Sequence, residues 1–221
     1  MWQKIFMKKK LTRRNIVITG ASGDIAQELI QRLQNDNLIL MSRSLPYPEI
    51  PERVDILINN AGFGEFEELE NLSDDQIEEM FKVNTLDLMK LTRDLQPQTQ
   101  VINIASMAGK LPTAKSTVYA ASKAAVLAFS DALRLEKPEL IVTTVNTGPV
   151  RTKFHKDNRA YLEKVGKNAI SAAYVASKIE KALGKRKREI NLPVQLAVVA
   201  KLRALFPRSV DFVGRKFFNY K

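Results

Sequence analysis

A short apolar strand followed by a glycine-rich turn and an amphipathic helix is the feature that most constrains the fold of this chain. Residues 15–19 read Asn-Ile-Val-Ile-Thr, a β-branched run typical of a buried parallel strand. The turn that follows contains Gly20 and Gly23. Glycines let a backbone pass close to a pyrophosphate, whose charge is attracted by the free amides of a helix N-terminus. The unit therefore predicts an α/β protein with a nucleotide-binding turn.

A second motif supplies groups that can transfer a proton. Tyr119 precedes Lys123 by four residues, and Ser106 stands thirteen residues before Tyr119, at the end of a predicted buried strand. Residues four apart share one face of a helix, so the lysine ammonium can lie beside the phenol and favour its ionised form. The same spacing recurs at Tyr174 and Lys178, but no strand ending in serine precedes that pair. We therefore expect the chemistry at the first pair.

In order and spacing, these motifs resemble those of the short-chain dehydrogenase/reductase family over roughly residues 15–192. The family's Asn-Asn-Ala-Gly segment appears at residues 59–62, and its Pro-Gly-type loop with a downstream threonine appears at residues 148–152. The resemblance implies an α/β fold with a doubly wound parallel sheet of six or seven strands, the Rossmann fold. It also implies an oxidoreductase that uses a nicotinamide dinucleotide to interconvert a carbonyl and an alcohol.

The resemblance further implies roles for individual residues. Tyr119 would exchange the proton, Lys123 would lower the pKa of Tyr119 and hold the nicotinamide ribose, and Ser106 would orient the substrate oxygen. Asn84 would support a proton relay; the alternative is a buried asparagine that only satisfies backbone groups. No metal site is expected. The implied cofactor-binding residues are Gly20, Ser22, Gly23, Ile25, Ser42, Arg43, Asn60, Ala61, Gly62, Tyr119, Lys123, Val150 and Thr152.

Two departures from the family pattern bear on cofactor binding. Asp24 and Ala26 replace the last two glycines usual in single-domain members, although the spacing of the two glycines present fits the extended members. A carboxylate at Asp24 would repel cofactor phosphates if it pointed inward. Only residues 44–53 separate the second predicted strand from the strand at 54–58, and three prolines there exclude a helix. We predict that the edge strand, third in the usual order, is absent.

The end of the second predicted strand indicates the choice of cofactor. An acid there would accept hydrogen bonds from a ribose 2′-hydroxyl, whereas an arginine would pair with a 2′-phosphate. This chain has Arg43 and no acid at that point. NADP(H) is therefore expected in preference to NAD(H). The alternative interpretation is that Arg43 is a solvated loop cation.

Two helices are predicted to flank the site. Residues 74–95 begin after Ser73, which has capping-box spacing to Gln76, and residues 116–135 carry the tyrosine and lysine of the second motif. Family members assemble through the corresponding helices, so the resemblance implies a homodimer or homotetramer. His155, the single histidine, lies in the predicted substrate loop at 153–170 and is assigned no role.

Charge and composition limit the partners and the compartment. Residues 1–14 carry six cations and no acids, and residues 181–221 carry eleven cations and two acids, within a net charge of +11. Basic ends on a mildly acidic body do not resemble a continuous nucleic-acid groove, so no nucleic acid is expected. The chain has no cysteine, which excludes disulfides and fits the cytoplasm.

We divide the chain into a basic extension (1–14), a catalytic domain (15–192) and an apolar, basic tail (193–221). The tail is predicted to be helical and to pack on the catalytic domain as a lid or dimer contact, which favours an apolar substrate. The alternative is a peripheral membrane protein whose tail lies on an anionic membrane surface. A further alternative is a scaffold or sensor that binds nucleotide with little or no turnover, in keeping with Asp24 and the missing strand.

Overall fold

The first strand and helix form where the glycine-rich motif predicts them. In the computed structural model, which describes residues 13–155 and 169–217, β1 spans Asn15–Thr19 and α1 spans Asp24–Arg32. Residues 16–18 have no exposed surface, as expected for a strand that is covered on both faces. The turn between β1 and α1 holds the two glycines of the motif.

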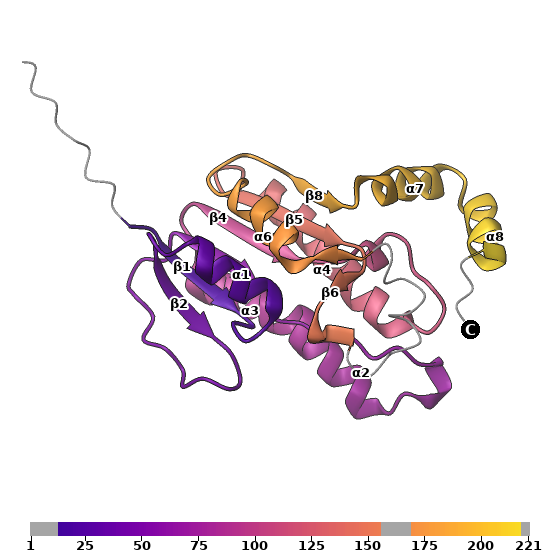
Figure 1. Ribbon diagram of the computed structural model, residues 1–221, viewed down its shortest axis with the longest axis horizontal. Helices are drawn as coiled ribbons and strands as arrows, with labels where there is room; N and C mark the ends of the chain where they lie inside the picture. The colour runs from indigo at the N-terminus through magenta and orange to yellow at the C-terminus, as the bar shows by residue number, and fades with distance from the viewer. Residues whose placement is uncertain (1–12, 156–168, 218–221) are drawn as a thin grey trace, which may run out of the picture.

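Within the described residues, six parallel strands form the central sheet: β1, β2 (Asn37–Met41), β3 (Ile56–Asn59), β4 (Gln100–Ile104), β5 (Ile141–Thr147) and β8 (Glu189–Leu192). Their order across the sheet is β2-β1-β3-β4-β5-β8 (Figure 1). The chain therefore runs outward from β1 to β2 and then returns to β3 on the other side of β1. In open α/β sheets, ligands bind at such a switch point, beyond the carboxyl ends of the strands.

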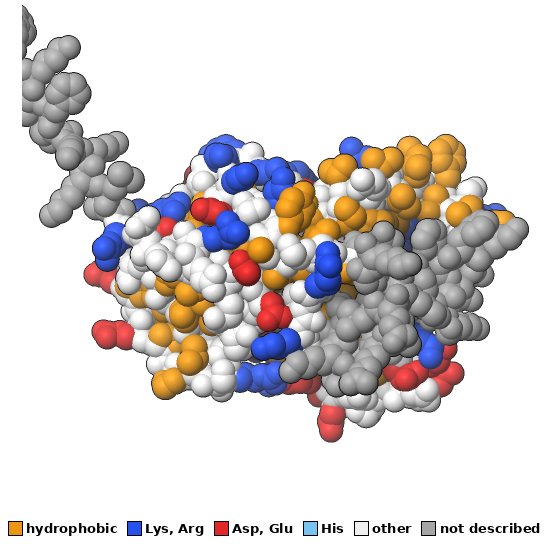
Figure 2. Space-filling view, in the orientation of Figure 1, with side chains coloured by type: hydrophobic (Ala, Val, Ile, Leu, Met, Phe, Trp, Pro, Cys, Tyr) orange, Lys and Arg blue, Asp and Glu red, His pale blue; other side chains and the backbone are white. Residues whose placement is uncertain are grey.

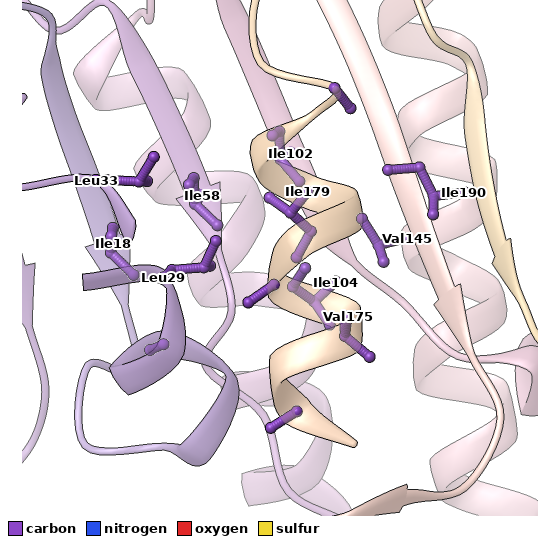
Figure 3. Close-up of a cluster of buried hydrophobic side chains, with 14 of the residues drawn as sticks. Ile18, Leu29, Leu33, Ile58, Ile102, Ile104, Val145, Val175, Ile179 and Ile190 are labelled. Atoms are coloured by element: carbon purple, nitrogen blue, oxygen red, sulfur yellow. The ribbon is translucent and has the colours of Figure 1, made fainter. Parts of the chain in front are cut away.

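Helices cover both faces of the sheet, which confirms the predicted doubly wound fold. On one face, α1 and α6 (Ala172–Glu180) bury apolar side chains against the strands (Figure 3). On the other face lie α3 (Asp87–Leu95) and α4 (Thr117–Glu136). Alternate strand residues serve the two layers, because successive side chains of a strand point to opposite faces. Ile16 and Ile18 join the first cluster, while Val17 packs with Leu57 on the second face.

The segment between β2 and β3 contains neither helix nor strand, as its prolines predict. β2 is therefore the edge of the sheet, and no strand of the described residues pairs with its outer side. The expected loss of the usual third strand is confirmed. Hydrogen bonds from Asn15 secure the returning segment: its amide donates to Asp55 Oδ2 at 2.9 Å, and its side chain donates to the Arg53 carbonyl at 2.8 Å.

The helix predicted over residues 74–95 is interrupted by one π-helical turn, a correction to the sequence-based expectation. α2 spans Asp74–Phe81, the π turn spans Lys82–Leu86, and α3 follows directly. A π turn inserts one residue into the helix, and such bulges often occur at functional sites. Asn84 lies at its centre and is fully buried. Apolar periodicity does not reveal the insertion, because the stripes on either side of it remain helical.

The start of α2 and both ends of α4 lie where the sequence predicts them. At the start of α2, Ser73 Oγ accepts from the Gln76 amide at 3.3 Å and the Gln76 side chain accepts from the Ser73 amide at 2.9 Å. α4 begins and ends within one residue of the predicted helix at 116–135. These patterns depend on residues close in sequence, which is why they can be predicted.

Two further helices follow β8 at the end of the described chain. α7 spans Val194–Leu205 and α8 spans Pro207–Phe217, and Arg203 joins them through hydrogen bonds of 2.7 and 3.3 Å to the carboxylate of Asp211. No helix of the described residues has the length and apolar character that crossing a membrane requires. The remaining short elements are η1 (Leu69–Asn71), η3 (Met107–Gly109), β6 (Val150–Arg151), η4 (Lys153–His155) and β7 (Ile170–Ser171).

A polar lock joins the carboxyl ends of β1 and β3. Thr19 Oγ1 accepts hydrogen bonds of 3.0 Å from the amides of Asn60 and Ala61. The Asn60 side chain donates in return to the carbonyls of Thr19 and Gly20 at 3.2 and 3.1 Å. Gly20 has a φ of 62°, and a β-carbon there would lie 2.8 Å from the Ala61 α-carbon. We call these four residues the β1–β3 lock, and it admits only glycine at position 20.

Replacing Gly20 with alanine is expected to destabilise the fold far more than left-handed backbone strain alone would. Gly184→Ala is the matched control, since Gly184 also has a positive φ of 71° but nothing within 4 Å of a new β-carbon. We expect Gly184→Ala to cost about 1 kcal/mol and Gly20→Ala about 3 kcal/mol, because the second adds overpacking against backbone. Urea unfolding measures both. Equal costs would show that the lock does not constrain the turn.

Candidate active site

A cleft of about 2460 Å³ opens at the carboxyl ends of β1, β3, β4 and β5. Ordinary small-molecule pockets have volumes of about 300–1,000 Å³, so this cleft has room for a dinucleotide together with a small substrate. It is lined by every site residue predicted from the sequence except Asn84, which lies behind its wall. The fold thus brings residues from the glycine turn, the Asn-Asn-Ala-Gly segment, β4 and α4 to one cleft.

Ser106 follows β4 and lies at the start of the short helix η3. Its Oγ accepts from the Ala108 amide at 3.1 Å and donates to the Thr147 carbonyl at 3.3 Å. The side chain is therefore held between the ends of β4 and β5, and the residue is 7% exposed. A hydroxyl in this position can exchange its donor bond for one to an oxygen in the cleft.

α4 presents Tyr119 and Lys123 to the cleft from successive turns. The Lys123 Nζ lies 5.9 Å from the centre of the Tyr119 ring and donates to the Ile104 carbonyl at 3.1 Å. Both residues are buried. Burial lowers the pKa of Lys123 to about 8, because the charged ammonium is poorly solvated there. The pair thus places a phenol beside an ammonium that is still mostly protonated at pH 7.

Asn84 connects the π turn to the loop after β3 and to α4. Its Oδ1 accepts from the Phe63 amide at 3.0 Å, and its Nδ2 donates to the Phe63 carbonyl at 2.9 Å and to Ser122 Oγ at 3.1 Å. A β-carbon on Gly62 would lie 3.0 Å from Asn84 Oδ1 and 3.1 Å from Lys123 Nζ. Asn84 and Lys123 therefore both border the space that a side chain at Gly62 would fill. Through these contacts Asn84 can position the loop after β3 and α4, and Lys123 lies close by.

Two aromatic side chains beside Tyr119 escaped the sequence-based prediction. The rings of Phe66 and Phe154 lie 5.3 and 5.9 Å from the Tyr119 ring, centre to centre, and 6.3 Å from each other. Phe66 belongs to the loop after β3 and Phe154 to η4, two residues beyond Thr152. The only signal in the sequence was an aromatic residue soon after each of two family motifs. Their contact with Tyr119 depends on the tertiary fold.

Asp24 starts α1 and points its carboxylate at the loop after β5. Its Oδ2 accepts a 2.6 Å hydrogen bond from the Lys153 amide. The carboxylate therefore ties the loop carrying Thr152 to the glycine turn. Gly23 precedes it, and a β-carbon at Gly23 would meet the Gly20 carbonyl at 3.2 Å. Thr152 itself accepts from the Phe154 amide at 3.3 Å through its Oγ1.

Arg43 lies beyond β2 at the far end of the cleft, with 88% of its side chain exposed. Its guanidinium is 4.0 Å from the Glu79 carboxylate of α2, and Lys82 lies 3.3 Å from the same carboxylate. Nearby, the hydroxyls of Ser42 and Ser44 are 2.9 Å apart. Two cations thus share one acid, and the two hydroxyls lie on the residues either side of Arg43, in a region open to solvent.

The second tyrosine–lysine pair lies elsewhere. Tyr174 and Lys178 are on α6, and neither lines the cleft. The Lys178 Nζ is 4.9 Å from the Tyr174 ring centre, and Tyr174 is 44% exposed. The His155 side chain, most of the predicted substrate loop at 153–170 and most of the basic extension at 1–14 lie outside the described residues.

Sequence comparison identifies the family. A profile described as short chain dehydrogenase matches residues 47–163, which is more than half of the chain. Ketoacyl reductase HetN from Nostoc sp. is 33% identical over 190 residues, covering 76% of this chain and 65% of HetN. The protein belongs to the short-chain dehydrogenase family. It spans 56–65% of the length of HetN, a Dictyostelium discoideum relative and the Escherichia coli oxidoreductase YbbO.

Solved structures share the fold at low sequence identity. A short-chain dehydrogenase from Streptomyces avermitilis matches with a TM-score of 0.74 and 23% identity over 92% of this chain and 97% of that one. One from Sphingobium yanoikuyae, in complex with NADPH, has a TM-score of 0.72 and 21% identity over 91% and 95%. One from Burkholderia phymatum, in complex with NAD, has a TM-score of 0.73 and 17% identity over 87% and 93%. At these identities the likeness concerns the fold alone.

Burial of Lys123 predicts a pH-dependent contribution to stability. Its pKa is about 8 in the folded protein against an ordinary 10.5, so the unfolded chain binds more protons between these values. The cost of burying the ammonium is complete below the folded pKa and is relieved as the pH rises toward 10.5. Relative to Lys123→Met, the wild type should gain about 2 kcal/mol between about pH 7 and pH 9.5. Urea unfolding at each pH measures this, and a constant difference would contradict it.

Proposed function

We propose that this protein is an NADP(H)-dependent oxidoreductase that interconverts a carbonyl and an alcohol. The observation that supports it most is the convergence of Tyr119, Lys123 and Ser106 on one cleft, which begins at the glycine turn. A proton donor, a neighbouring cation and a hydrogen-bonding hydroxyl are the groups that carbonyl reduction needs. The tail's role as a lid, the cytoplasmic location and the homodimer or homotetramer implied by the family remain predictions.

The cleft residues fit a nicotinamide dinucleotide. The turn has no room for a β-carbon at Gly20 and little at Gly23, and the first residues of α1 line the same cleft, where the amides of a helix N-terminus favour phosphate. Asn60 and Ala61 would border the adenosine half, while Val150 and Thr152 would lie beside the nicotinamide. When bound, the cofactor supplies or accepts the hydride. The protein supplies orientation and proton transfer.

In the direction of reduction, Tyr119 gives its phenolic proton to the substrate oxygen as the carbonyl carbon becomes tetrahedral. The Lys123 cation stabilises the phenolate left behind, and Ser106 Oγ donates a hydrogen bond to the same oxygen. Asn84 acts through the Phe63 backbone and α4, and so fixes the position of Lys123 relative to the loop after β3. Oxidation reverses each proton transfer, with the phenolate accepting the alcohol proton.

The cleft near Tyr119 favours an apolar substrate. Phe66 and Phe154 stand beside the phenol, and Leu196 and Val199 of α7 line the same cleft. Such walls bind hydrocarbon or aromatic groups by removing them from water. We therefore infer an apolar aldehyde, ketone or alcohol as the small-molecule partner.

The preference for NADP(H) rests on the cations at the end of β2. A 2′-phosphate in this region would lie within reach of Arg43, Lys82 and the serine hydroxyls, and guanidinium groups bind phosphate well. Glu79 now pairs with both cations. A bound phosphate would therefore compete with the Glu79 carboxylate for them.

The alternative is a nucleotide-binding scaffold or sensor with little turnover. The Asp24 carboxylate stands at the N-terminus of α1, beside the region where phosphates would bind, and the sheet lacks the strand that usually borders adenine. Both features would weaken cofactor binding. Turnover by the wild type distinguishes the enzyme from the scaffold.

Tyr119→Phe is expected to abolish turnover while leaving the cofactor bound. Loss of general acid catalysis should lower kcat by about 10²–10⁴-fold, measured as NADPH oxidation with a panel of apolar aldehydes and ketones. NADPH affinity, followed by nicotinamide fluorescence, should stay within about three-fold, since the ring remains. Tyr174→Phe removes the hydroxyl of the second tyrosine–lysine pair and should leave kcat unchanged. Equal activity of Tyr119→Phe and the wild type would refute the assigned role.

Arg43→Ala is expected to weaken NADPH binding about ten-fold and to leave NADH binding unchanged, because only the former has the 2′-phosphate. Glu79→Gln should strengthen NADPH binding, since it removes the competing carboxylate. Arg53→Ala, another exposed arginine on the segment before β3, is the control and should have no effect. If Arg43→Ala weakened both cofactors equally, or neither, the preference would be wrong.

A further inference from the structure

The outward face of α7 is apolar along its whole length. Val194, Val198, Leu202 and Leu205 are 68%, 57%, 46% and 71% exposed. Their spacing of four, four and three residues places them on one side of the helix. Single exposed apolar residues are common on proteins, but a continuous stripe of this kind marks a contact surface.

This stripe is not needed to hold α7 in place. The opposite side of the helix faces the cleft, where Leu196 and Arg203 line the wall. The Leu196 side chain lies close to Gly148, 2.9 Å from where a β-carbon there would stand, and Arg203 pairs with Asp211 of α8. The helix is therefore fixed by its inner side. Its outer side is available to a partner.

α8 extends the apolar surface. Phe206, between the two helices, is 60% exposed, and Phe212 and Val213 of α8 are 68% and 48% exposed. Figure 2 shows hydrophobic side chains gathered over α7. We call the outer side of the two helices the α7–α8 face. Large exposed aromatic and aliphatic side chains insert readily into the boundary region of a bilayer.

Positive charge borders this apolar surface. Lys201 and Arg208 are exposed on the two helices, and Asp211, which pairs with Arg203, is the single acid in residues 193–221. The run Lys-Arg-Lys-Arg at 185–188 is exposed as well. In Figure 1 the segment leading into β8 and α7 follow the same edge of the molecule, and Figure 2 shows cationic side chains beside the hydrophobic ones there.

We propose that the α7–α8 face docks on an anionic membrane surface. Apolar side chains would enter the boundary of the bilayer, while the flanking lysines and arginines would pair with acidic lipid head groups. A second copy of the chain fits less well, because a symmetric contact would bring two positively charged surfaces together. The cleft would then open beside the lipid, since the inner side of α7 forms part of its wall.

Vesicle flotation of the full chain tests the proposal. Wild type should float with vesicles of phosphatidylcholine and phosphatidylglycerol, and far less with phosphatidylcholine alone. The variant Val198→Asp/Leu202→Asp should lose binding at least ten-fold. Leu69→Asp changes a residue of similar exposure, 51%, far from α7 in the chain, and should bind as the wild type does. Circular dichroism checks that both variants are folded.

A second variant separates lipid docking from other origins of binding. Lys201→Gln/Arg208→Gln should weaken binding to anionic vesicles roughly five-fold for each cation removed. If anionic vesicles bound the wild type and the Val198→Asp/Leu202→Asp variant equally, binding would come from the basic ends of the chain and the proposal would be overturned. It would also be overturned if no vesicle bound and sedimentation showed a dimer that only this variant lost.

Discussion

The lock between β1 and β3 is the contact on which the cleft depends. Thr19 and Asn60 exchange hydrogen bonds between a side chain and the backbone of the opposite strand end. Because Gly20 lies against Ala61 without a side chain, the turn closes tightly and the first residues of α1 lie at the cleft. Gly62, next along, leaves the space between the buried polar groups of the site. Contacts through residues 60–62 therefore connect the glycine turn to Lys123 of the tyrosine–lysine pair.

The arrangement buries polar groups behind the cleft, and their burial lowers the stability of the fold. The Lys123 ammonium is buried with the Ile104 carbonyl as a hydrogen-bond acceptor, and burial lowers its pKa to about 8. The π turn brings Asn84 and Thr85 against Ser122, one residue before the lysine. A fold selected for stability alone gains little from a buried cation of this kind. Perturbed groups of this kind concentrate at catalytic sites, which connects the energetics of the core to the proposed chemistry.

Local sequence patterns predicted the fold and most of the residues that line the cleft. The glycine-rich unit, the prolines of residues 42–55 and the helix that carries the tyrosine act over short stretches, so the sequence predicts them. The contacts that it did not predict are long-range. Asp24 meets Lys153 across 129 residues, and Phe154 reaches the tyrosine from a separate loop. The π turn at Asn84 escaped because the apolar stripes before and after it each keep helical spacing.

Deuterium transfer tests the central claim most directly. The protein would be incubated with NADPH carrying deuterium at C4 of the nicotinamide and with each of a series of apolar aldehydes and ketones. Mass spectrometry of the alcohols then reports where the label goes. The account predicts one deuterium on the carbinol carbon of at least one product, from one face of the nicotinamide only. NADPH that binds tightly but transfers no label to any carbonyl would contradict it and favour the scaffold.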